Sequence, residues 1–464
     1  SENPNTTTRT VQFVVDDGTD TSTPQTRSVA ITATNDAPTV TPTGSTLNYT
    51  EGDGAVAVDG GLTISDVDDT DLEGATISIT NFVAGQDLLS FTNQLGITGS
   101  WNGTTGVLTL SGTASVASYQ TAIRSITYTN TSENPNTTTR TVQFVVGDGT
   151  DTSAPTSRNI AMAADNDAPV VTPTGSTLNY TEGDGAVAVD TGLTISDADD
   201  TNLESATIAI TNFVAGQDVL TFVDQLGLTG SWNGTTGVLT LSGTASVANY
   251  QTALRSITYT NNSDNPDTTT RTVEFIVSDG TDTSTPQTRS VAIAADNDAP
   301  VLTPTGSTLD YTEGDGAVAV DTGLTISDVD DTNLEGATIS ITNFVAGQDL
   351  LSFTNQLGIT GSWNGTTGVL TLSGTASVAN YQTAIRSITY TNTSENPNTT
   401  TRTVQFVVDD GTDTSTPQTR SVAIAATNDA PTVTPTGSTL DYTEGDGAVA
   451  VDTGLTISDA DDTN

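Results

Sequence analysis

Apolar and polar residues alternate in short runs along this chain, and this pattern predicts β-strands. Within 271–278, Val273, Phe275 and Val277 fall on one face and polar residues fall on the other. Such alternation is typical of an antiparallel strand with one buried face. The same pattern, bounded by Gly, Asn, Asp or Pro, predicts further strands over 207–211, 237–242 and 290–294.

One segment has a helical pattern instead. Val247, Tyr250 and Leu254 are spaced three and four residues apart, so they share one face of a helix. Ser246 or Thr244 is the expected N-cap, because a side-chain oxygen there can accept a hydrogen bond from the first turn. We therefore expect a single short helix that covers one end of the sheets.

A hairpin is predicted where two strands are joined by Trp232-Asn-Gly-Thr-Thr-Gly237, because Asn-Gly is a strong turn signal. The rest of the unit likewise consists of short strands separated by turn residues. Many short strands and one short helix in a unit of this length indicate an all-β fold, a β-sandwich with Greek-key connections.

The whole pattern repeats with a fixed period of 131 residues, without insertions. An Asn-Asp-Ala-Pro motif opens at Asn35, Asn166, Asn297 and Asn428. A strict period indicates a tandem array of one domain, arranged end to end. The predicted units are a partial repeat 1–36, the complete repeats 37–167, 168–298 and 299–429, and a partial repeat 430–464. Since both ends fall inside a repeat, we expect a segment of a longer protein.

Composition limits the chemistry that is available. The chain has no Cys, His or Lys, and 11 Arg stand against 56 acidic residues, which gives a net charge of -45. Nucleic acids and anionic membranes are therefore not expected as partners, and we expect no membrane insertion. The charge also calls for bound cations or a saline medium, although 34% hydrophobic residues suffice for a core in each repeat.

Acidic loops lie at the ends of several strands. In a Greek-key sandwich the last strand runs into the linker, and the strand before it is antiparallel. The loop between them holds Asp279 and Asp282, so it returns to the pole where Asn166 and Asp167 enter the domain. Two further acidic segments are expected at the same pole, Glu182 after the first strand and the loop of Asp197 and Asp199.

These motifs resemble the calcium motifs of cadherins. The residues that carry the resemblance are Asp296-Asn-Asp-Ala-Pro300, Glu182 in Tyr-Thr-Glu-Gly-Asp-Gly, Asp197-Ala-Asp199, and Ile276-Val-Ser-Asp279-Gly. The chain is similar over its whole length to bacterial cadherin-like repeats, related to VCBS-type repeats, of large surface and secreted adhesins. The resemblance implies cadherin/Ig-like domains with Ca²⁺ at their junctions. The linker lacks the extra Asn of animal cadherins, and no acidic mid-domain motif is apparent, so the number of ions per junction stays open.

Calcium is coordinated by six to eight oxygens from carboxylates, Asn side chains and carbonyls, whereas zinc favours His or Cys, which this chain lacks. The predicted ligands recur in each repeat and are Asn35, Asp36, Glu51, Asp66, Asp68, Asp148, Asn166, Asp167, Glu182, Asp197, Asp199, Asp279, Asn297, Asp298, Glu313, Asp328, Asp330, Asp410, Asn428, Asp429, Glu444, Asp459 and Asp461.

Two of these interpretations have alternatives. Asp-Gly and Asn-Asp-Ala-Pro segments also form ordinary turns and linkers, so plain turns compete with calcium sites at the acidic loops. The single Trp of each repeat is either a platform for stacking a sugar or part of the core. These residues are Trp101, Trp232 and Trp363.

The sequence argues against an enzyme, because only carboxylates remain for acid-base catalysis and every acidic pair recurs in each repeat. We expect an extracellular stalk or filament segment at a cell surface or in a secreted protein, with Ca²⁺ stiffening the junctions between neighbouring repeats. Two alternatives remain, a subunit of a self-assembling filament or sheath and a multivalent carbohydrate-binding array. Partners outside the chain would then be other copies of the fibre or cell-surface glycans.

Overall fold

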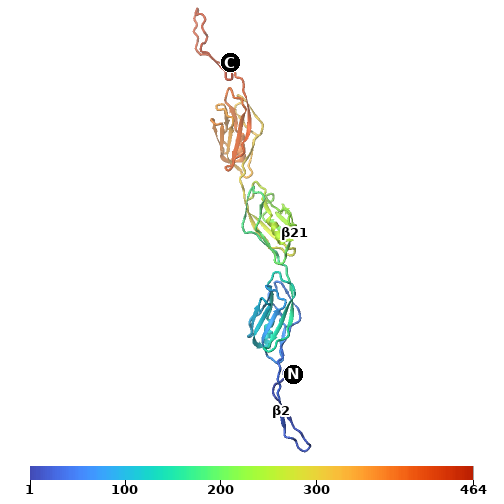
Figure 1. Cartoon of the computed structure of the whole chain (residues 1–464). Coiled ribbons are helices and arrows are strands. Elements are labelled where there is room, and N and C mark those ends of the chain that lie inside the picture. The colour runs from blue at the N-terminus through green and yellow to red at the C-terminus, as the bar shows by residue number, and fades with distance from the viewer. Residues whose placement is uncertain (463–464) are drawn as a thin grey trace.

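A computed structural model describes residues 1–462. The predicted partial repeat 430–464 thus has its last two residues, 463–464, outside the described residues. Three units each bury a hydrophobic core of their own, and the core residues of each unit lie within one predicted repeat. Figure 1 shows these units in a row, joined by single linkers, with the two ends of the chain at opposite ends of the row.

The unit within 168–298 shows the architecture that all three share. Its elements are β14 (Val170–Thr172), β15 (Leu178–Thr181), β16 (Val187–Ala188), β17 (Thr194–Ser196), β18 (Asn202–Ile210), β19 (Asp218–Thr221), β20 (Thr229–Asn233), β21 (Val238–Ser246), α2 (Val247–Arg255), β22 (Thr258–Asn261), β23 (Arg271–Ser278) and β24 (Gln287–Ala294).

The units on either side repeat these elements in the same order. The preceding unit consists of β3 (Thr39–Thr41), β4 (Leu47–Thr50), β5 (Val56–Ala57), β6 (Thr63–Ser65), β7 (Asp71–Ile79), β8 (Asp87–Ser90), β9 (Thr98–Asn102), β10 (Val107–Ser115), α1 (Val116–Arg124), β11 (Thr127–Asn130), β12 (Arg140–Gly147) and β13 (Thr156–Ala163). The following unit consists of β25 (Val301–Thr303), β26 (Leu309–Thr312), β27 (Val318–Ala319), β28 (Thr325–Ser327), β29 (Asn333–Ile341), β30 (Asp349–Ser352), β31 (Thr360–Asn364), β32 (Val369–Ser377), α3 (Val378–Arg386), β33 (Thr389–Asn392), β34 (Arg402–Asp409) and β35 (Gln418–Ala425).

Each unit is a β-sandwich, which confirms the predicted fold class. A six-stranded sheet has the order β15-β24-β23-β18-β21-β20, and a three-stranded sheet β16-β22-β19 and the pair β14-β17 accompany it. Side chains from all three sheets form one core. β23 follows β22 in the chain but pairs with β18 of the larger sheet, so the chain crosses between sheets as a Greek-key connection requires.

The predicted local elements are confirmed in the same unit. Val273, Phe275 and Val277 are fully buried on one face of β23. The helix α2 begins after Ser246, whose hydroxyl accepts a hydrogen bond from the Asn249 amide at 3.2 Å. Its apolar face packs into the core beside β17 and β21.

The predicted hairpin joins β20 to β21. Asn233 pairs with Val238 across the hairpin, and its side chain accepts hydrogen bonds from the backbone within the turn. The left-handed residue is Gly237, with φ of +71°, and not the Gly of the Asn-Gly pair. A side chain at Gly237 would also meet Phe213 at 2.5 Å, so both conformation and space require glycine there.

One strand pair in each unit is parallel, and it decides which residues reach which pole. β15, the second strand, lies beside β24, the last strand, with Thr181 opposite Ala294. Both strands therefore end at the pole from which the chain leaves the unit. The Glu182 amide donates a hydrogen bond to the Ala294 carbonyl at 2.9 Å, which fixes Glu182 at that pole.

Each core contains a buried ion pair. Arg271, at the start of β23, is fully buried and its Nε lies 2.7 Å from Asp218 Oδ2. Tyr259 donates its hydroxyl to the other carboxylate oxygen at 2.6 Å, and the amide of Asn261 donates to the same oxygen at 3.2 Å. The neighbouring units repeat this arrangement with Arg140 and Arg402.

The two end segments each form one antiparallel strand pair and have no buried core of their own among the described residues. β1 (Arg9–Phe13) pairs with β2 (Gln25–Val29), and β36 (Thr432–Thr434) pairs with β37 (Thr456–Ser458). Phe13 is 55% exposed, whereas the equivalent Phe144 is fully buried in its unit. In the part of the chain that the structure describes, no helix is both long enough and apolar enough to cross a membrane.

Candidate metal centre

Four junctions connect successive units, and we number them in chain order by the Asn of the linker. Junction 1 contains Asn35, junction 2 contains Asn166, junction 3 contains Asn297 and junction 4 contains Asn428.

The linker Asn is held by the loop between the last two strands of the downstream unit. At junction 2, Asn166 Nδ2 lies 3.1 Å from Asp279 Oδ2 and 2.9 Å from Asp282 Oδ2. This loop therefore returns to the pole where the linker enters, as expected. Burial opposes ionisation of Asp279, but backbone amides, with the Asn166 amide, lower its pKa on balance. The carboxylate is thus already stabilised by donors of the protein itself.

The same Asn contact recurs at two other junctions. Asn35 donates to Asp148 and Asp151 at 3.1 and 2.9 Å, and Asn297 donates to Asp410 and Asp413, both at 3.2 Å. At junction 4, Asn428 instead donates to the Asp429 carbonyl at 2.7 Å.

The loop after β17 brings a second acidic group to the same pole. The amides of Asp199 and Asp200 donate to Asp197 Oδ1 at 3.2 and 2.9 Å, which folds the loop around that carboxylate. The Asp167 amide faces Asp199 Oδ1 at 3.3 Å, so the linker lies against the loop. Oxygens from Asp197, Asp199 and Asp200 lie within 4.8 Å of one another.

Equivalent loops stand at the other junctions. Junction 1 has Asp36 beside Asp66 and Asp68, junction 3 has Asp298 beside Asp328 and Asp330, and junction 4 has Asp429 beside Asp459 and Asp461.

The expected position of Glu182 is wrong. It does not reach the entry pole of its own unit, because the parallel pairing of β15 with β24 directs it to the exit pole. There its Oε2 accepts a hydrogen bond from the Asp296 amide at 3.1 Å. Glu51 and Glu313 behave alike, so each Glu belongs to the junction that follows its unit. Glu444 lies exposed in the last partial unit.

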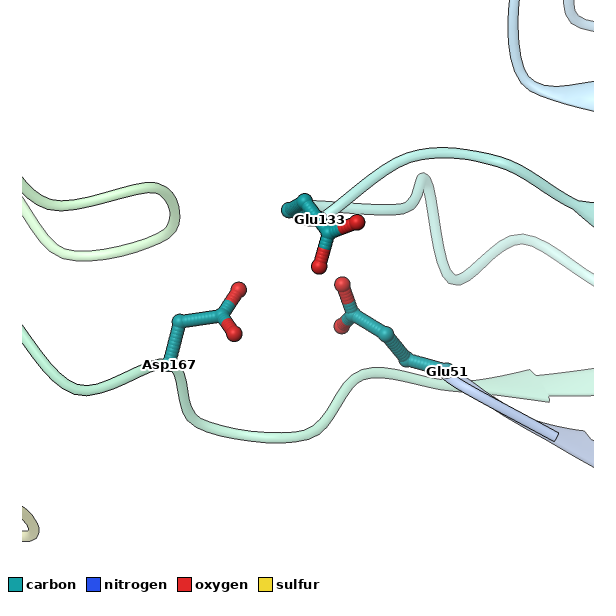
Figure 2. Close-up of side chains that lie close together, drawn as sticks. All are labelled: Glu51, Glu133 and Asp167. Atoms are coloured by element: carbon teal, nitrogen blue, oxygen red, sulfur yellow. The ribbon is translucent and has the colours of Figure 1, made fainter.

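Sequence reasoning missed a carboxylate that completes the upstream side. Glu133, in the loop between β11 and β12, approaches Glu51 and Asp167, and one oxygen of each lies within 4.8 Å of the others. Figure 2 shows the three carboxylates pointing toward one another from separate segments. Glu133 belongs to a Ser-Glu/Asp-Asn-Pro motif that recurs every 131 residues, at Glu2, Asp264 and Glu395. That period is the signal that could have identified it.

The residue after this Glu forms hydrogen bonds between the two units. Asn134 Nδ2 donates to the carbonyls of Ala198 and Asp199 in the next unit, at 3.3 and 3.5 Å. Asn3, Asn265 and Asn396 make the equivalent contact at the other junctions.

Several carboxylate oxygens at the junctions are buried without any hydrogen-bond partner. These oxygens are Glu51 Oε1, Asp66 Oδ2, Asp167 Oδ2, Asp197 Oδ2, Glu313 Oε1, Asp328 Oδ2, Asp330 Oδ1, Asp429 Oδ2 and Asp461 Oδ1. All belong to the predicted ligand set. A buried anionic oxygen without a donor is costly unless a cation or a proton compensates it.

Glu51, Asp167 and Asp197, which are among these residues, have raised pKa values. Burial raises the pKa of Glu51, and the neighbouring charges of Asp167 and Glu133 raise it further. Burial likewise raises the pKa of Asp167, and also that of Asp197. The pKa of Asp279 is lowered instead, because backbone amides and the Asn166 amide donate to its carboxylate.

The donor set fits a hard cation. Junctions 2 and 4 each gather carboxylates from the exit pole of one unit, the linker and the entry pole of the next, with several oxygens lacking a proton donor. Calcium prefers such oxygen ligands, and the chain offers no Cys or His for a softer metal. Glu51, Glu133, Asp167, Asp197 and Asp199 are the residues that would hold it at junction 2.

The single Trp of each repeat packs on its own unit. The Trp232 ring meets Phe213 edge to face, with centroids 5.9 Å apart, and lies against the core. Trp101 and Trp363 do the same with Phe82 and Phe344. This packing favours the core interpretation, since only part of each ring is accessible for stacking.

Comparisons with known proteins give one relative in sequence. The chain is 34% identical over 390 residues to Halomucin of Haloquadratum walsbyi (strain DSM 16790 / HBSQ001), an alignment that covers 76% of this chain and 4% of that protein. The chain therefore matches only a small part of that relative's length. No family model matches the chain.

Similar solved structures include cadherin ectodomains. Human CDH23 EC21-23 has a TM-score of 0.32 at 13% identity, covering 84% of this chain and all of that one. The human Desmocollin-1 ectodomain has a TM-score of 0.22 at 15% identity, covering 91% and 69%. Scores this low support no further inference, so the sandwich assignment rests on the strand pairing, and the bacterial VCBS-type assignment stays a prediction.

Proposed function

We propose that the chain is a segment of an extracellular stalk whose junctions bind Ca²⁺ and thereby become stiff. The observation that carries the proposal is the set of buried carboxylate oxygens without partners, which is fullest at junctions 2 and 4. At those two junctions the oxygens come from two successive units, so a cation bound between them would link those units. The match to a small part of a much longer relative supports a segment role.

The energetic effect per junction is modest. Calcium sites of extracellular modules bind at roughly 10⁻⁴ to 10⁻³ M. At millimolar calcium, each such site would contribute about 0.4 to 1.4 kcal/mol. That range is too small to fold a domain but sufficient to bias a hinge, and the effect accumulates along a row of junctions.

The proposed role is mechanical and not catalytic. Each acidic group recurs at successive junctions, and the units between them differ little. The neighbouring unit is then the principal partner of each unit, through contacts such as that of Asn134 with Ala198. Binding of other copies or of glycans is a separate proposal, and a glycan array probed with the whole chain tests it.

Small-angle X-ray scattering of the full chain tests the calcium proposal. We expect a long, narrow particle in millimolar Ca²⁺ and a shorter, more variable one after chelation. Mg²⁺ at the same ionic strength should not restore the long form, because it demands a smaller octahedral site. Identical profiles in calcium and in chelator would contradict the proposal.

A matched pair of variants locates the effect. The double variant Glu51→Gln/Asp167→Asn removes two carboxylates at junction 2 and should produce a flexible hinge even in calcium. The control is Glu274→Gln, which removes a charge on β23 and introduces the residue found at the equivalent positions Gln143 and Gln405. If the control loosens the chain as much as the double variant, net charge and not a site explains the result.

A further inference from the structure

Junctions 2 and 3 form a natural comparison within one chain. Both have Asp before the linker Asn, both have the same Asp positions in the downstream loop, and both have a Glu after the second strand of the upstream unit. The junction carboxylates named above differ in type between the two junctions at one position only, where junction 2 has Glu133 and junction 3 has Asp264.

The upstream carboxylates meet differently at these junctions. Glu51, Glu133 and Asp167 gather within 4.8 Å at junction 2, and Glu313, Glu395 and Asp429 do so at junction 4. Among the described residues, the equivalent set at junction 3, Glu182 with Asp264 and Asp298, forms no such group. Aspartate is shorter than glutamate by one methylene, that is by one C–C bond of about 1.5 Å.

The unsatisfied oxygens follow the same division. Glu51 and Asp167 at junction 2, and Glu313 and Asp429 at junction 4, each bury an oxygen without a partner. The upstream and linker residues of junction 3 have none among the described residues, and only Asp328 and Asp330 of its downstream loop do. A cavity of about 440 Å³ lies between Asp264, Asp298 and the downstream loop, and a cavity of about 340 Å³ occupies the equivalent place at junction 4.

From these differences we infer that junction 3 holds its cation less tightly than junction 2, so that the stalk bends first at this junction as calcium falls. This inference rests on the proposed function and adds that the junctions are graded by one side chain. Calcium affinity depends on the number of ligands and the rigidity of the site, and the described upstream and linker carboxylates of junction 3 lie outside the close grouping that their equivalents form at junction 2.

Paired spin labels test the inference in the full chain, which has no native Cys. The double variant Thr137→Cys/Thr201→Cys spans junction 2, and Thr268→Cys/Thr332→Cys occupies the equivalent exposed positions across junction 3. Distance distributions measured by pulsed electron resonance, over a series of Ca²⁺ concentrations, give a midpoint for each junction. We expect the midpoint at junction 3 to be higher by roughly three- to tenfold.

Reciprocal exchanges assign the cause. Asp264→Glu should bring the junction 3 midpoint to that of junction 2, and Glu133→Asp should raise the junction 2 midpoint by a similar factor. Both changes are at exposed positions, and each introduces the residue that the other junction already has.

The outcomes separate the inference from the function on which it rests. The grading of the junctions is wrong if calcium narrows the distance distributions of both junctions with equal midpoints. It is also wrong if the difference between the two midpoints persists after the residue exchanges. In both cases the proposed function stands. If neither junction responds to Ca²⁺, the proposed function fails and the inference fails with it.

Discussion

Buried carboxylates occur in two regions of this molecule, and the two regions neutralise them differently. In the core, Asp218 lies against the fully buried Arg271 and accepts further hydrogen bonds from Tyr259 and Asn261. At the junctions, no Arg approaches within salt-bridge distance of Glu51 in the described part of the chain, and one of its oxygens has no donor at all. Each unit therefore carries the counter-charge for its fold within itself, whereas under the proposed function the carboxylates between units take theirs from the solution.

The largest effect should follow from breaking the core pair. Arg271→Ala leaves Asp218 buried without its counter-ion, which costs about 3 to 5 kcal/mol. Thermal unfolding should show one of the three units melting early, with or without calcium. Asp267→Asn, which introduces the residue found at Asn136 and Asn398, serves as a control that should leave melting almost unchanged. If the Arg271→Ala chain melts like the parent, Asp218 does not depend on Arg271 for its counter-charge, and the contrast between core and junction is wrong.

A smaller effect is expected from pH at the junctions. The pKa of Glu51 is raised in the folded state, so without calcium a bound proton stabilises the junction in which Glu51 lies beside Glu133 and Asp167. This stabilisation is lost as pH rises through the raised pKa. Calcium competes with that proton, so its apparent affinity should fall as pH drops from about 7 to about 5. Calcium titrations of the junction 2 spin-label pair at several pH values measure the change.

The control for the pH effect removes the titrating group. In Glu51→Gln the pH dependence of the calcium midpoint should be weaker, because fewer protons compete with the ion. A midpoint that stays constant down to about pH 5 in the parent chain would show that these carboxyl groups do not bind the ion.

The smallest effect should come from Asp165. Its contact with Glu51 Oε2 uses the backbone amide at 3.1 Å, and Thr427 makes the same contact with Glu313 at 2.9 Å. Asp165→Thr should therefore change the calcium midpoint at junction 2 by less than about twofold, and unfolding by less than about 0.5 kcal/mol. A larger loss would mean that the Asp165 carboxylate binds the cation directly.

The sequence was sufficient where structure depends on neighbours in the chain. Three predictions that depend on local chemistry are confirmed. They are the strand β23, from its alternating apolar and polar residues, the helix cap at Ser246 and the Asn-Gly hairpin. The return of the Asp279 loop to Asn166 followed from one topological rule and is confirmed as geometry. Calcium binding by these residues, and the exact domain boundaries, stay predictions.

Residues placed by contacts distant in sequence were harder to predict. The destination of Glu182 depends on β15 lying parallel to β24, a pairing between segments more than a hundred residues apart that no local pattern reports. Glu133 escaped notice because its loop has neither strand nor Asp-Gly character, although its motif has the period of the repeat. The positively charged partner of each core carboxylate was also missed, since Arg271 looked like the edge of a strand and is fully buried.

The parallel pair of each unit also determines how the row would respond to being pulled. The chain enters a unit at the pole where β15 begins and leaves at the pole where β24 ends, and the two strands are paired from Leu178 with Val291 to Thr181 with Ala294. Tension along the stalk therefore slides these strands past each other instead of peeling them apart. Their hydrogen bonds share the force and must break together. The pairing that places Glu182 at the junction therefore also loads each unit in shear when the stalk is pulled.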